Sequence, residues 1–378
     1  MSRCAQRKGK KMKENYNVGI IGATGMVGQR FITLLANHPW YTIKVLAASP
    51  RSAGKTYKEA VGAKWAMDEE IPASVADMTV MNATDDVEKI AGMVDFVFCA
   101  VDMKKDEIKA LEERYAKAEC PVVSNNSAHR HTPDVPMVIP EINPQHIEII
   151  PSQRKRLGTK RGFIAVKSNC SLQSYLPAMA VINMKYPIDR AIVTTYQAIS
   201  GAGKTFETWP EMVDNLIPYI GGEEMKSEVE PNKVLGKIEG DEIVPSTEMH
   251  IECQTYRVPV SNGHTAAIFF SFKDGVKKPS VEEIEKMWAE YKGVPQELEL
   301  PHAPKQFIHV YTEKDQPDQP QIKTAREIDG GMAISCGRLR ESTQFDYKMV
   351  SMSHNTLRGA AGGAVLLAEL LTAKGYMD

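Results

Sequence analysis

Apolar and polar positions alternate regularly over the first 165 residues. Four short apolar runs resemble strands that are buried on both faces of a parallel sheet, at residues 17–22 (NVGIIG), 41–49 (YTIKVLAAS), 94–101 (VDFVFCAV) and 120–125 (CPVVSN). The stretches 26–38 and 104–118 have helical spacing between these runs. This order of strands and helices predicts an α/β fold, with a Rossmann-type doubly wound parallel sheet over residues 17–165.

The pattern changes near residue 163. Longer strand-like runs follow at residues 190–200, 250–260 and 264–273, with fewer helices between them. They predict an α+β second domain with a mixed or antiparallel sheet over residues 166–355. Residues 356–378 then form a strongly apolar C-terminal helix. The stretches 295–306 and 314–321 are rich in proline and charge, which indicates surface loops.

Composition places the chain among ordinary globular proteins. It has 378 residues, 43% hydrophobic and 25% charged, with a formal net charge of −2. This balance argues against a protein whose overall charge draws it to nucleic acid or to an anionic membrane. Residues 1–16 are basic and lack the apolar core of a signal peptide, so we expect a flexible tail. Nucleic-acid contact by this tail is the weaker alternative. With no transmembrane run in the sequence, we expect a cytoplasmic protein.

Six cysteines are scattered along the chain, at positions 4, 99, 120, 170, 253 and 336. They contain no CxxC pair, so we expect neither a structural zinc site nor a disulfide framework, and no metal. Cys99, Cys253 and Cys336 lie in strand-like runs. Cys170 differs, because it stands between the run that ends in Ser168-Asn169 and an expected helix. A helix N-terminus there would favour the thiolate, although Pro177 must either kink this helix or delay its start.

A glycine-rich loop follows the first strand. Gly22, Gly25 and Gly28 have GxxGxxG spacing, a variant of the dinucleotide-binding pattern, in the required strand–loop–helix context. The glycines allow a tight turn, and the helix N-terminus can face a pyrophosphate. We expect cofactor contacts from this loop at five residues: Gly22, Thr24, Gly25, Met26 and Val27.

The end of the second strand bears on the choice of cofactor. NAD sites place an acid there for the ribose 2′-hydroxyl, whereas this strand continues into Ser49, Arg51 and Ser52. An arginine with hydroxyl groups suits a 2′-phosphate, so we favour NADP over a merely solvated basic loop. By contrast, residues 199–205 (ISGAGKT) do not form a nucleoside-triphosphate loop, since Ala198 occupies the place of its first glycine.

A nicotinamide domain together with an activated cysteine suggests one type of chemistry. The thiolate attacks an acyl or aldehyde carbon, and the resulting adduct exchanges a hydride with the cofactor. Six motifs then resemble aspartate-semialdehyde dehydrogenases of the archaeal and fungal branch: SNCS at 168–171, TYQAISG at 195–201, GGEEMKSE at 221–228, YRVPVSNGH at 256–264, GATGMVGQRF at 22–31 and NTLRGAAGGA at 355–364.

The resemblance implies the catalytic residues. Cys170 would be the nucleophile, His264 the general acid–base and Gln197 the residue that orients the acyl intermediate. From the residue type alone, a single histidine beside a strand is more often structural. We also expect backbone N–H groups at the start of the helix after Cys170 to stabilise the oxyanion.

The resemblance also implies the substrate contacts. Arg257 would bind the α-carboxylate and Glu223 the α-ammonium group. Arg130, Lys226 and Asn126 would surround the phosphate. Without the resemblance, these charged residues are equally typical of a solvated surface.

Cofactor contacts from the second domain would come from Ser200, Gly201 and Asn355. The resemblance further implies that the C-terminal helix packs back on the cofactor domain, and that the broad second sheet forms a homodimer or homotetramer interface.

The implied reaction is the NADPH-dependent reductive dephosphorylation of L-aspartyl 4-phosphate to L-aspartate 4-semialdehyde, on the route to lysine, threonine and methionine. One alternative is a malonyl-CoA reductase-like enzyme that releases CoA. Glu223 and Arg257 argue against it, because an amino-acid substrate needs both charges. N-acetyl-glutamyl-phosphate reductases are related, but they place the cysteine in a Pro-Gly-Cys-Tyr setting that this chain lacks. A non-catalytic NADP-binding sensor is the alternative from another class.

Overall fold

The computed structural model describes residues 13–312 and 320–378. Most of the expected tail (1–16) and most of the expected loop at 314–321 lie outside the described residues. Tyr16 is an exception, because it begins the first strand and is fully buried. Within the described residues, no helix is long and apolar enough to span a membrane.

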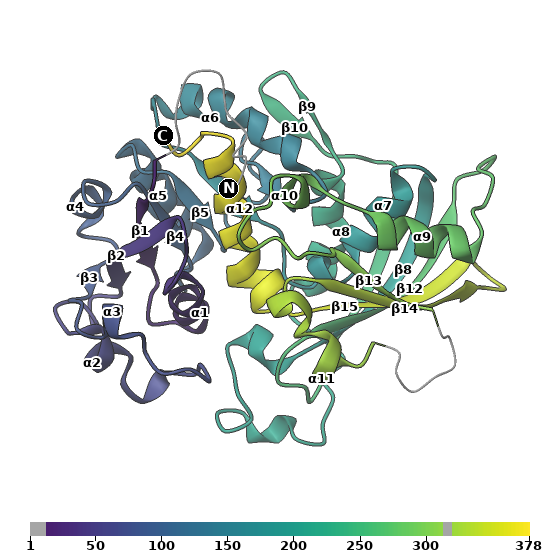
Figure 1. Cartoon of the computed structure of the whole chain (residues 1–378), viewed down its shortest axis with the longest axis horizontal. Helices are drawn as coiled ribbons and strands as arrows, with labels where there is room; N and C mark the ends of the chain where they lie inside the picture. The colour runs from purple at the N-terminus through teal and green to yellow at the C-terminus, as the bar shows by residue number, and fades with distance from the viewer. Residues whose placement is uncertain (1–12, 313–319) are drawn as a thin grey trace.

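The first domain is built on an entirely parallel seven-stranded sheet. Its strands lie in the order β3 (Met81–Asn82), β2 (Tyr41–Ala48), β1 (Tyr16–Ile21), β4 (Phe96–Cys99), β5 (Val122–Ser124), β7 (Ile164–Lys167) and β6 (Met137–Val138). Its helices are α1 (Met26–Leu35), α2 (Tyr57–Val61), α3 (Ala73–Ala76), α4 (Val87–Ala91), α5 (Lys105–Lys117) and α6 (Ile150–Leu157), with 3₁₀ turns at Gly62–Lys64 and Pro144–Ile149. The doubly wound prediction is confirmed. The central strands β1 and β4 are apolar because helices cover both of their faces (Figure 1).

The second domain contains a mixed six-stranded sheet, which confirms the predicted α+β class. The strand order is β11 (His250–Arg257), β8 (Ile188–Gln197), β12 (His264–Phe272), β15 (Tyr347–Ser353), β14 (Ile334–Glu341) and β13 (Ile308–Tyr311). A separate hairpin pairs β9 (Lys237–Glu239) with β10 (Glu242–Val244). The helices are α7 (Leu176–Asn183), α8 (Glu223–Val234), α9 (Val281–Glu290), α10 (Val294–Glu297) and α11 (Ile322–Ala325), with 3₁₀ turns at Leu172–Ser174, Ile199–Ala202, Pro210–Met212 and Ile328–Gly331. Because α10 takes up part of the expected loop at 295–306, that loop prediction is wrong at its start.

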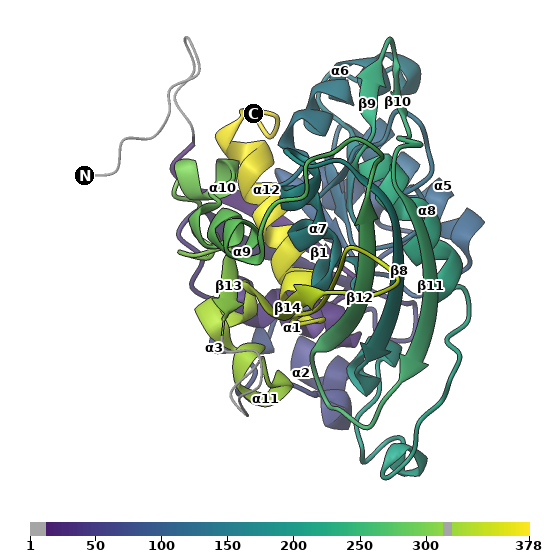
Figure 2. The same ribbon diagram turned by 90° about the vertical axis from the view of Figure 1, so that its right-hand side faces the viewer.

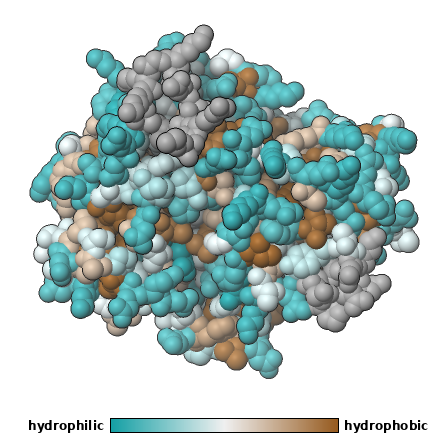
Figure 3. Space-filling model, in the orientation of Figure 1, coloured by the Kyte–Doolittle hydropathy of each residue, from teal (hydrophilic) through white to brown (hydrophobic). Residues whose placement is uncertain are grey.

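Side chains alternate between the two faces of β8 from Ala191 to Gln197. Val193 and Thr195 face the buried side beneath the helices, whereas Ile192 and Tyr196 are 40% and 36% exposed on the other side. Phe269 of β12 is also exposed. Figure 2 shows β12, β8 and β11 facing the viewer as one broad surface. On the face drawn in Figure 3, small hydrophobic groups lie between predominantly hydrophilic side chains.

The C-terminal segment lies between the two domains (Figure 1). A π-helical turn (Leu357–Ala361) with a kink at Ala360 precedes α12 (Gly362–Ala373), so the expected single helix has an irregular start. Helix α12 is apolar around its whole circumference, which fits burial on all sides. It contacts β5, β7 and α1 of the first domain.

Candidate active site

The glycine-rich loop connects β1 to α1 and needs glycine at two points. Gly22 has φ +93°, and a Cβ there would lie 2.4 Å from the Ala100 carbonyl oxygen. A Cβ on Gly28 would lie 2.2 Å from the Gly22 carbonyl oxygen, so only glycine lets α1 approach the loop this closely. Gly25 is exposed and precedes the first turn of α1. The loop thus leaves the N-terminus of α1 accessible to a phosphate group.

One cavity runs along the edge of the first sheet. Gly22, Thr24 and Gly25 line it together with Ser49. Its floor includes residues that the sequence analysis did not name: Ala83, Thr84, Val101 and Asp102. Arg51 is exposed two residues beyond Ser49, in a turn closed by the Ser52 N–H donating to the Ser49 carbonyl oxygen. Ser49 thus lines the cavity, whereas Arg51 and Ser52 lie next to it in the chain and are not part of its lining.

A second cavity, of about 320 Å³, brings distant segments together. Its lining contains ten residues from the predicted site: Met26, Val27, Asn126, Arg130, Cys170, Ser200, Gly201, Glu223, Lys226 and Asn355. Loop residues of the first domain therefore meet the nucleophile candidate across a single space. Gln197, Arg257 and His264 are buried behind this lining.

Cys170 lies in a turn, not at a helix N-terminus. The Ser171 N–H donates to Asn169 Oδ1 at 2.7 Å, and α7 begins only at Leu176, with Pro177 in its first turn. A 3₁₀ turn, Leu172–Ser174, follows the cysteine, and the regular helix begins only at α7, which is the delayed start that Pro177 predicted. Since the Ser171 N–H is already bonded, the expected oxyanion donation from a helix start is not available at this residue.

His264, the first residue of β12, is the partner of the thiol. Its Nε2 lies 3.5 Å from Cys170 Sγ, while its Nδ1 accepts the Ala198 N–H at 3.1 Å. The neutral ring must then carry its proton on Nε2, facing the sulfur. Burial, reinforced by the Arg257 charge, lowers the pKa of His264 to about 3.

The resting thiol is not activated by its surroundings. Burial raises the pKa of Cys170, and the Glu223 carboxylate raises it further, although Lys167, Arg130 and Arg257 act in the opposite direction. The thiolate that a helix N-terminus would favour is therefore not indicated, because only a short 3₁₀ turn, Leu172–Ser174, follows the cysteine and burial outweighs the nearby cations. The free protein therefore holds a neutral thiol beside a neutral imidazole.

Opposite charges gather beside this pair. Glu223, at the start of α8, forms an ion pair of 2.7 Å with Lys226 and accepts the Asn169 side-chain amide. Burial acts to raise the pKa of Glu223, but Lys226 and these hydrogen bonds lower it overall. Gln197 Nε2 lies 3.4 Å from the Glu223 carboxylate, and Arg257 donates to the Ala198 carbonyl oxygen at 2.7 Å. A carboxylate and a guanidinium group are thus available for the α-ammonium and α-carboxylate groups of an amino acid.

Arg130 is held firmly at the other end of the cavity. Its guanidinium donates to Glu230 at 2.9 Å, to the Lys167 carbonyl oxygen and to the Asn125 carbonyl oxygen. The Asn126 side chain, which also lines the cavity, donates to buried Glu112 at 3.0 Å.

The C-terminal segment closes the site from behind. Asn355 accepts a hydrogen bond from the Gly263 N–H and donates one to Ser200 Oγ at 2.9 Å. These bonds join the motifs at 355–364, 256–264 and 195–201. A Cβ on Gly201 would lie 2.9 Å from Arg257 Nη1, so a larger residue there would require the guanidinium group to shift. Gly359 packs directly against the nucleophile, since a Cβ there would lie 3.0 Å from Cys170 Cβ.

Comparison with known proteins agrees with this geometry. Residues 17–150 match the model of the semialdehyde dehydrogenase NAD binding domain, and residues 179–358 match the semialdehyde dehydrogenase dimerisation domain. Aspartate-semialdehyde dehydrogenase of Candida albicans is 42% identical, with 94% of this chain and 98% of the relative covered. The chain belongs to the aspartate-semialdehyde dehydrogenase family.

Further aspartate-semialdehyde dehydrogenases extend the comparison. The enzyme of Methanothermobacter thermautotrophicus is 41% identical, over 94% of this chain and 98% of the relative. The crystal structure of the Candida albicans enzyme with NADP superimposes with a TM-score of 0.85, at 39% identity, and covers 96% of this chain and 99% of that one. Aspartate-semialdehyde dehydrogenase II of Vibrio cholerae, complexed with ASA, gives a TM-score of 0.71 at 25% identity, over 95% and 98% of the two chains. Both fungal and archaeal relatives are present, as the motifs predicted.

Sequence reasoning missed three members of the site in this aspartate-semialdehyde dehydrogenase family protein. Asn169 and Glu230 hold the nucleophile turn, because the Asn169 N–H donates to Glu230 at 2.8 Å. Lys167 lines the cavity three residues before Cys170. A charged residue at the end of an apolar strand was the available signal for Lys167. Glu230 had none, since it is one of several acids on α8.

Proposed function

We propose that this chain is an NADP-dependent aspartate-semialdehyde dehydrogenase that converts L-aspartyl 4-phosphate to L-aspartate 4-semialdehyde. The observation that carries the proposal is the Cys170–His264 pair, with the charges of Glu223, Arg257 and Arg130 acting on the sulfur. An amino acid whose head groups and phosphate are bound by these charges would present its acyl carbon to the sulfur.

Each polar group of the substrate has a counterpart. In this proposal Arg257 binds the α-carboxylate, and Glu223 exchanges part of its pairing with Lys226 for the α-ammonium group. Lys226, Arg130 and Asn126 face the acyl phosphate. Gln197 orients the acyl oxygen.

Chemistry then proceeds at Cys170. The sulfur forms a bond to the acyl carbon as the carbon–oxygen bond to phosphate breaks, and the thiol proton leaves with the phosphate. When bound, the nicotinamide supplies a hydride for the thioester carbon. The thiohemiacetal oxygen then re-forms the carbonyl group as the sulfur departs, and the Nε2–H of His264 hydrogen-bonds to that sulfur. A solvent proton restores the thiol.

The residues present fit NADP. Gly22, with its positive φ, and the exposed Gly25 allow a pyrophosphate close to the backbone, and Ser49, Arg51 and Ser52 offer hydroxyls and a cation where NAD sites carry an acid. Met26 and Val27, the first two residues of α1, line the cavity of Cys170. Ser200, Gly201 and Asn355 line the same cavity. The nicotinamide end would therefore reach the thioester.

The assembly proposed is a homodimer or homotetramer built on the outer face of β8, β11 and β12. Ile192, Tyr196 and Phe269 expose large apolar groups there, and Tyr196 stacks on Tyr256 with ring centroids 5.8 Å apart. Domain limits at 165/166 and 355/356, and a cytoplasmic location, stay predictions.

The reverse reaction tests the proposal. Purified protein is mixed with L-aspartate semialdehyde, inorganic phosphate and NADP or NAD, and reduced nicotinamide is followed by absorbance, with Cys170→Ala as the control. Phosphate-dependent reduction that vanishes in the control supports the proposal. Oxidation of NADPH by malonyl-CoA, without activity on the semialdehyde, would mean that the proposed substrate is wrong and that the proposed chemistry at the thiol still holds. Cofactor binding without any turnover would favour the sensor.

A further inference from the structure

A buried lysine without an assigned role lines the substrate cavity. Lys167 is the last residue of β7 and is only 2% exposed. Its ammonium group donates to the Ser168 carbonyl oxygen at 2.5 Å, and this is its one hydrogen bond among the described residues. An ammonium group has three donors, so two of them remain for a partner within the cavity.

The charges of the cavity do not balance without such a partner. Arg130 is paired with Glu230 at 2.9 Å, and Lys226 with Glu223 at 2.7 Å. No carboxylate within ion-pair distance accompanies Lys167 in the part of the chain that the structure describes. A buried unpaired cation is unfavourable, and an anionic ligand removes that cost.

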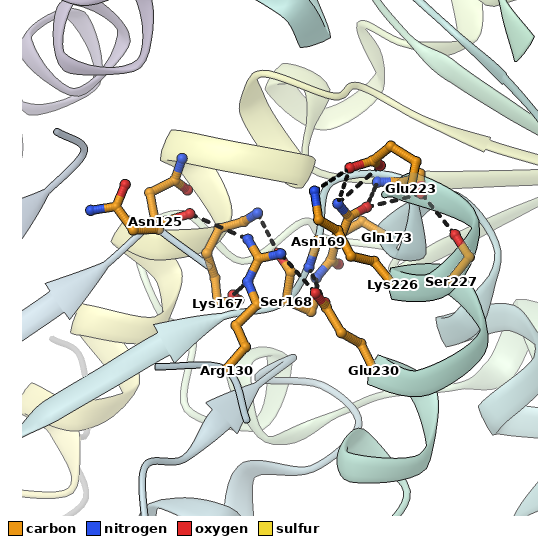
Figure 4. A network of polar contacts seen from close by, with 12 residues as sticks. Asn125, Arg130, Lys167, Ser168, Asn169, Gln173, Glu223, Lys226, Ser227 and Glu230 are labelled. Atoms are coloured by element: carbon orange, nitrogen blue, oxygen red, sulfur yellow. Dashed lines mark hydrogen bonds and ion pairs between the residues drawn. The ribbon is translucent and has the colours of Figure 1, made fainter. Parts of the chain in front are cut away.

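A larger share of the N–H donors is unused on Lys167 than on the neighbouring Arg130. Arg130 spends Nε, one Nη1 proton and one Nη2 proton on Lys167, Glu230 and Asn125. The two cations lie side by side in Figure 4, with the Arg130 guanidinium bonded to the backbone of Lys167 itself. Burial, together with the Arg130 charge, lowers the pKa of Lys167 to about 7, so a bound anion would favour the protonated form at neutral pH.

A second buried lysine provides the contrast. Lys233 of α8 is 4% exposed, but its Nζ donates to two backbone carbonyl oxygens, Thr132 at 2.6 Å and Val135 at 2.8 Å. Lys233 does not line the cavity of Cys170. It is a structural lysine with two satisfied donors, whereas Lys167 faces a ligand space with one.

We propose that Lys167 is a further substrate-binding residue, which donates from Nζ to the phosphate of the acyl phosphate and, in reverse, to inorganic phosphate. Unlike Arg130 and Lys226, it lines the cavity as a cation with no carboxylate within ion-pair distance among the described residues. The assignment deepens the proposed function and depends on it for its kinetic test.

The kinetic test compares Lys167→Met with the wild type in the reverse reaction. We expect the KM for inorganic phosphate to rise about 10- to 100-fold, because one or two charge-assisted hydrogen bonds are lost. The KM for semialdehyde and for NADP should change by less than about threefold. Lys233→Met is the matched control and should lower thermal stability without changing the KM for phosphate. An unchanged KM for phosphate in active Lys167→Met would overturn the proposal.

A binding test does not need turnover. Inorganic phosphate should slow the alkylation of Cys170 by iodoacetamide in the wild type but not in Lys167→Met, as followed by mass spectrometry. If Lys167→Met does not fold, Lys167→Gln replaces it. If phosphate protects the wild type but not Lys167→Met, and the wild type has no dehydrogenase activity, the phosphate contact is supported and the proposed function is rejected. Equal protection in wild type and variant, with normal turnover, would reject the contact and keep the function.

Discussion

His264 Nε2 lies 3.5 Å from Cys170 Sγ, and its opposite ring nitrogen already accepts the Ala198 N–H. An imidazolium would need a proton on both nitrogens and would lose the Ala198 hydrogen bond. The resting enzyme is therefore a neutral pair and not a thiolate–imidazolium pair.

Alkylation of Cys170 should therefore increase only at alkaline pH. Because burial and Glu223 raise the pKa of the thiol, the rate with iodoacetamide should have its midpoint above the ordinary thiol value of about 8.5. Cys170→Ala gives the background from other cysteines. A plateau of reactivity between pH 5 and about 7, typical of a thiolate–imidazolium pair, would contradict the neutral pair.

Removal of the Glu223 charge should shift this profile. The carboxylate raises the pKa of Cys170, so Glu223→Gln should move the midpoint of alkylation to lower pH while it weakens semialdehyde binding. The neighbouring Glu224→Gln is the control, since Glu224 accepts the Thr255 N–H outside the cavity. A midpoint that rises in Glu223→Gln would show that the cause of the shift is misassigned.

A methyl group on Gly359 should displace the nucleophile. The added Cβ would lie 3.0 Å from Cys170 Cβ and 3.2 Å from its carbonyl oxygen, so the turn or the π-helical segment must move. We expect Gly359→Ala to lower kcat about 100-fold by misplacing the sulfur, with about 1–3 kcal/mol of lost stability. Gly92→Ala, whose Cβ would have only ordinary contacts, is the control. Unchanged kcat would mean that the packing adjusts without moving Cys170.

Arg51 should determine the preference for NADP. Arg51→Ala is expected to raise the KM for NADP about 10- to 100-fold and to leave the KM for NAD nearly unchanged, because only NADP carries the 2′-phosphate. Steady-state kinetics with both cofactors measures the ratio. Lys58→Ala removes an exposed charge from nearby α2 and should change neither value. An equal effect of Arg51→Ala on both cofactors would reject this role.

A hydrogen-bonded cluster should make stability depend on pH. Glu369 of α12 accepts from His38 at 2.9 Å and from His302 at 2.6 Å, while the Trp40 N–H occupies the other ring nitrogen of His38. Burial lowers the pKa of His38, despite its bond to Glu369. The unfolded chain then binds a proton that the folded chain does not, so stability should fall as the pH drops below about 6.5.

Thermal unfolding between pH 7.5 and 5.5 measures this loss. His38→Gln should reduce the slope by at most about 1.4 kcal/mol per pH unit, whereas exposed His250→Gln should leave it unchanged. A steeper slope in His38→Gln would mean that the buried ring is charged in the folded state.

The exposed face of the second sheet should hold the oligomer together. Tyr196→Glu places a charge among apolar groups on β8, and we expect the mass in light scattering to fall toward that of one 42.0 kDa chain. Met93→Glu, an exposed apolar position in the first domain, should not change the mass. Retention of the oligomer in Tyr196→Glu would place the interface elsewhere.

The sequence alone determined the two sheets and most residues around the site. Local rules suffice for these, because strands such as β4 are apolar throughout, most of β8 alternates, and the loop at Gly22 needs glycine for its backbone. The cysteine between a strand and a turn was also visible from its neighbours.

The tertiary structure decided the chemistry of that cysteine. The raised pKa of Cys170 follows from burial and from Glu223 on a distant helix. The unpaired charge of Lys167 is likewise a property of which carboxylates pair with other cations. Burial and charge balance depend on distances between elements far apart in the chain, and no local pattern encodes those distances.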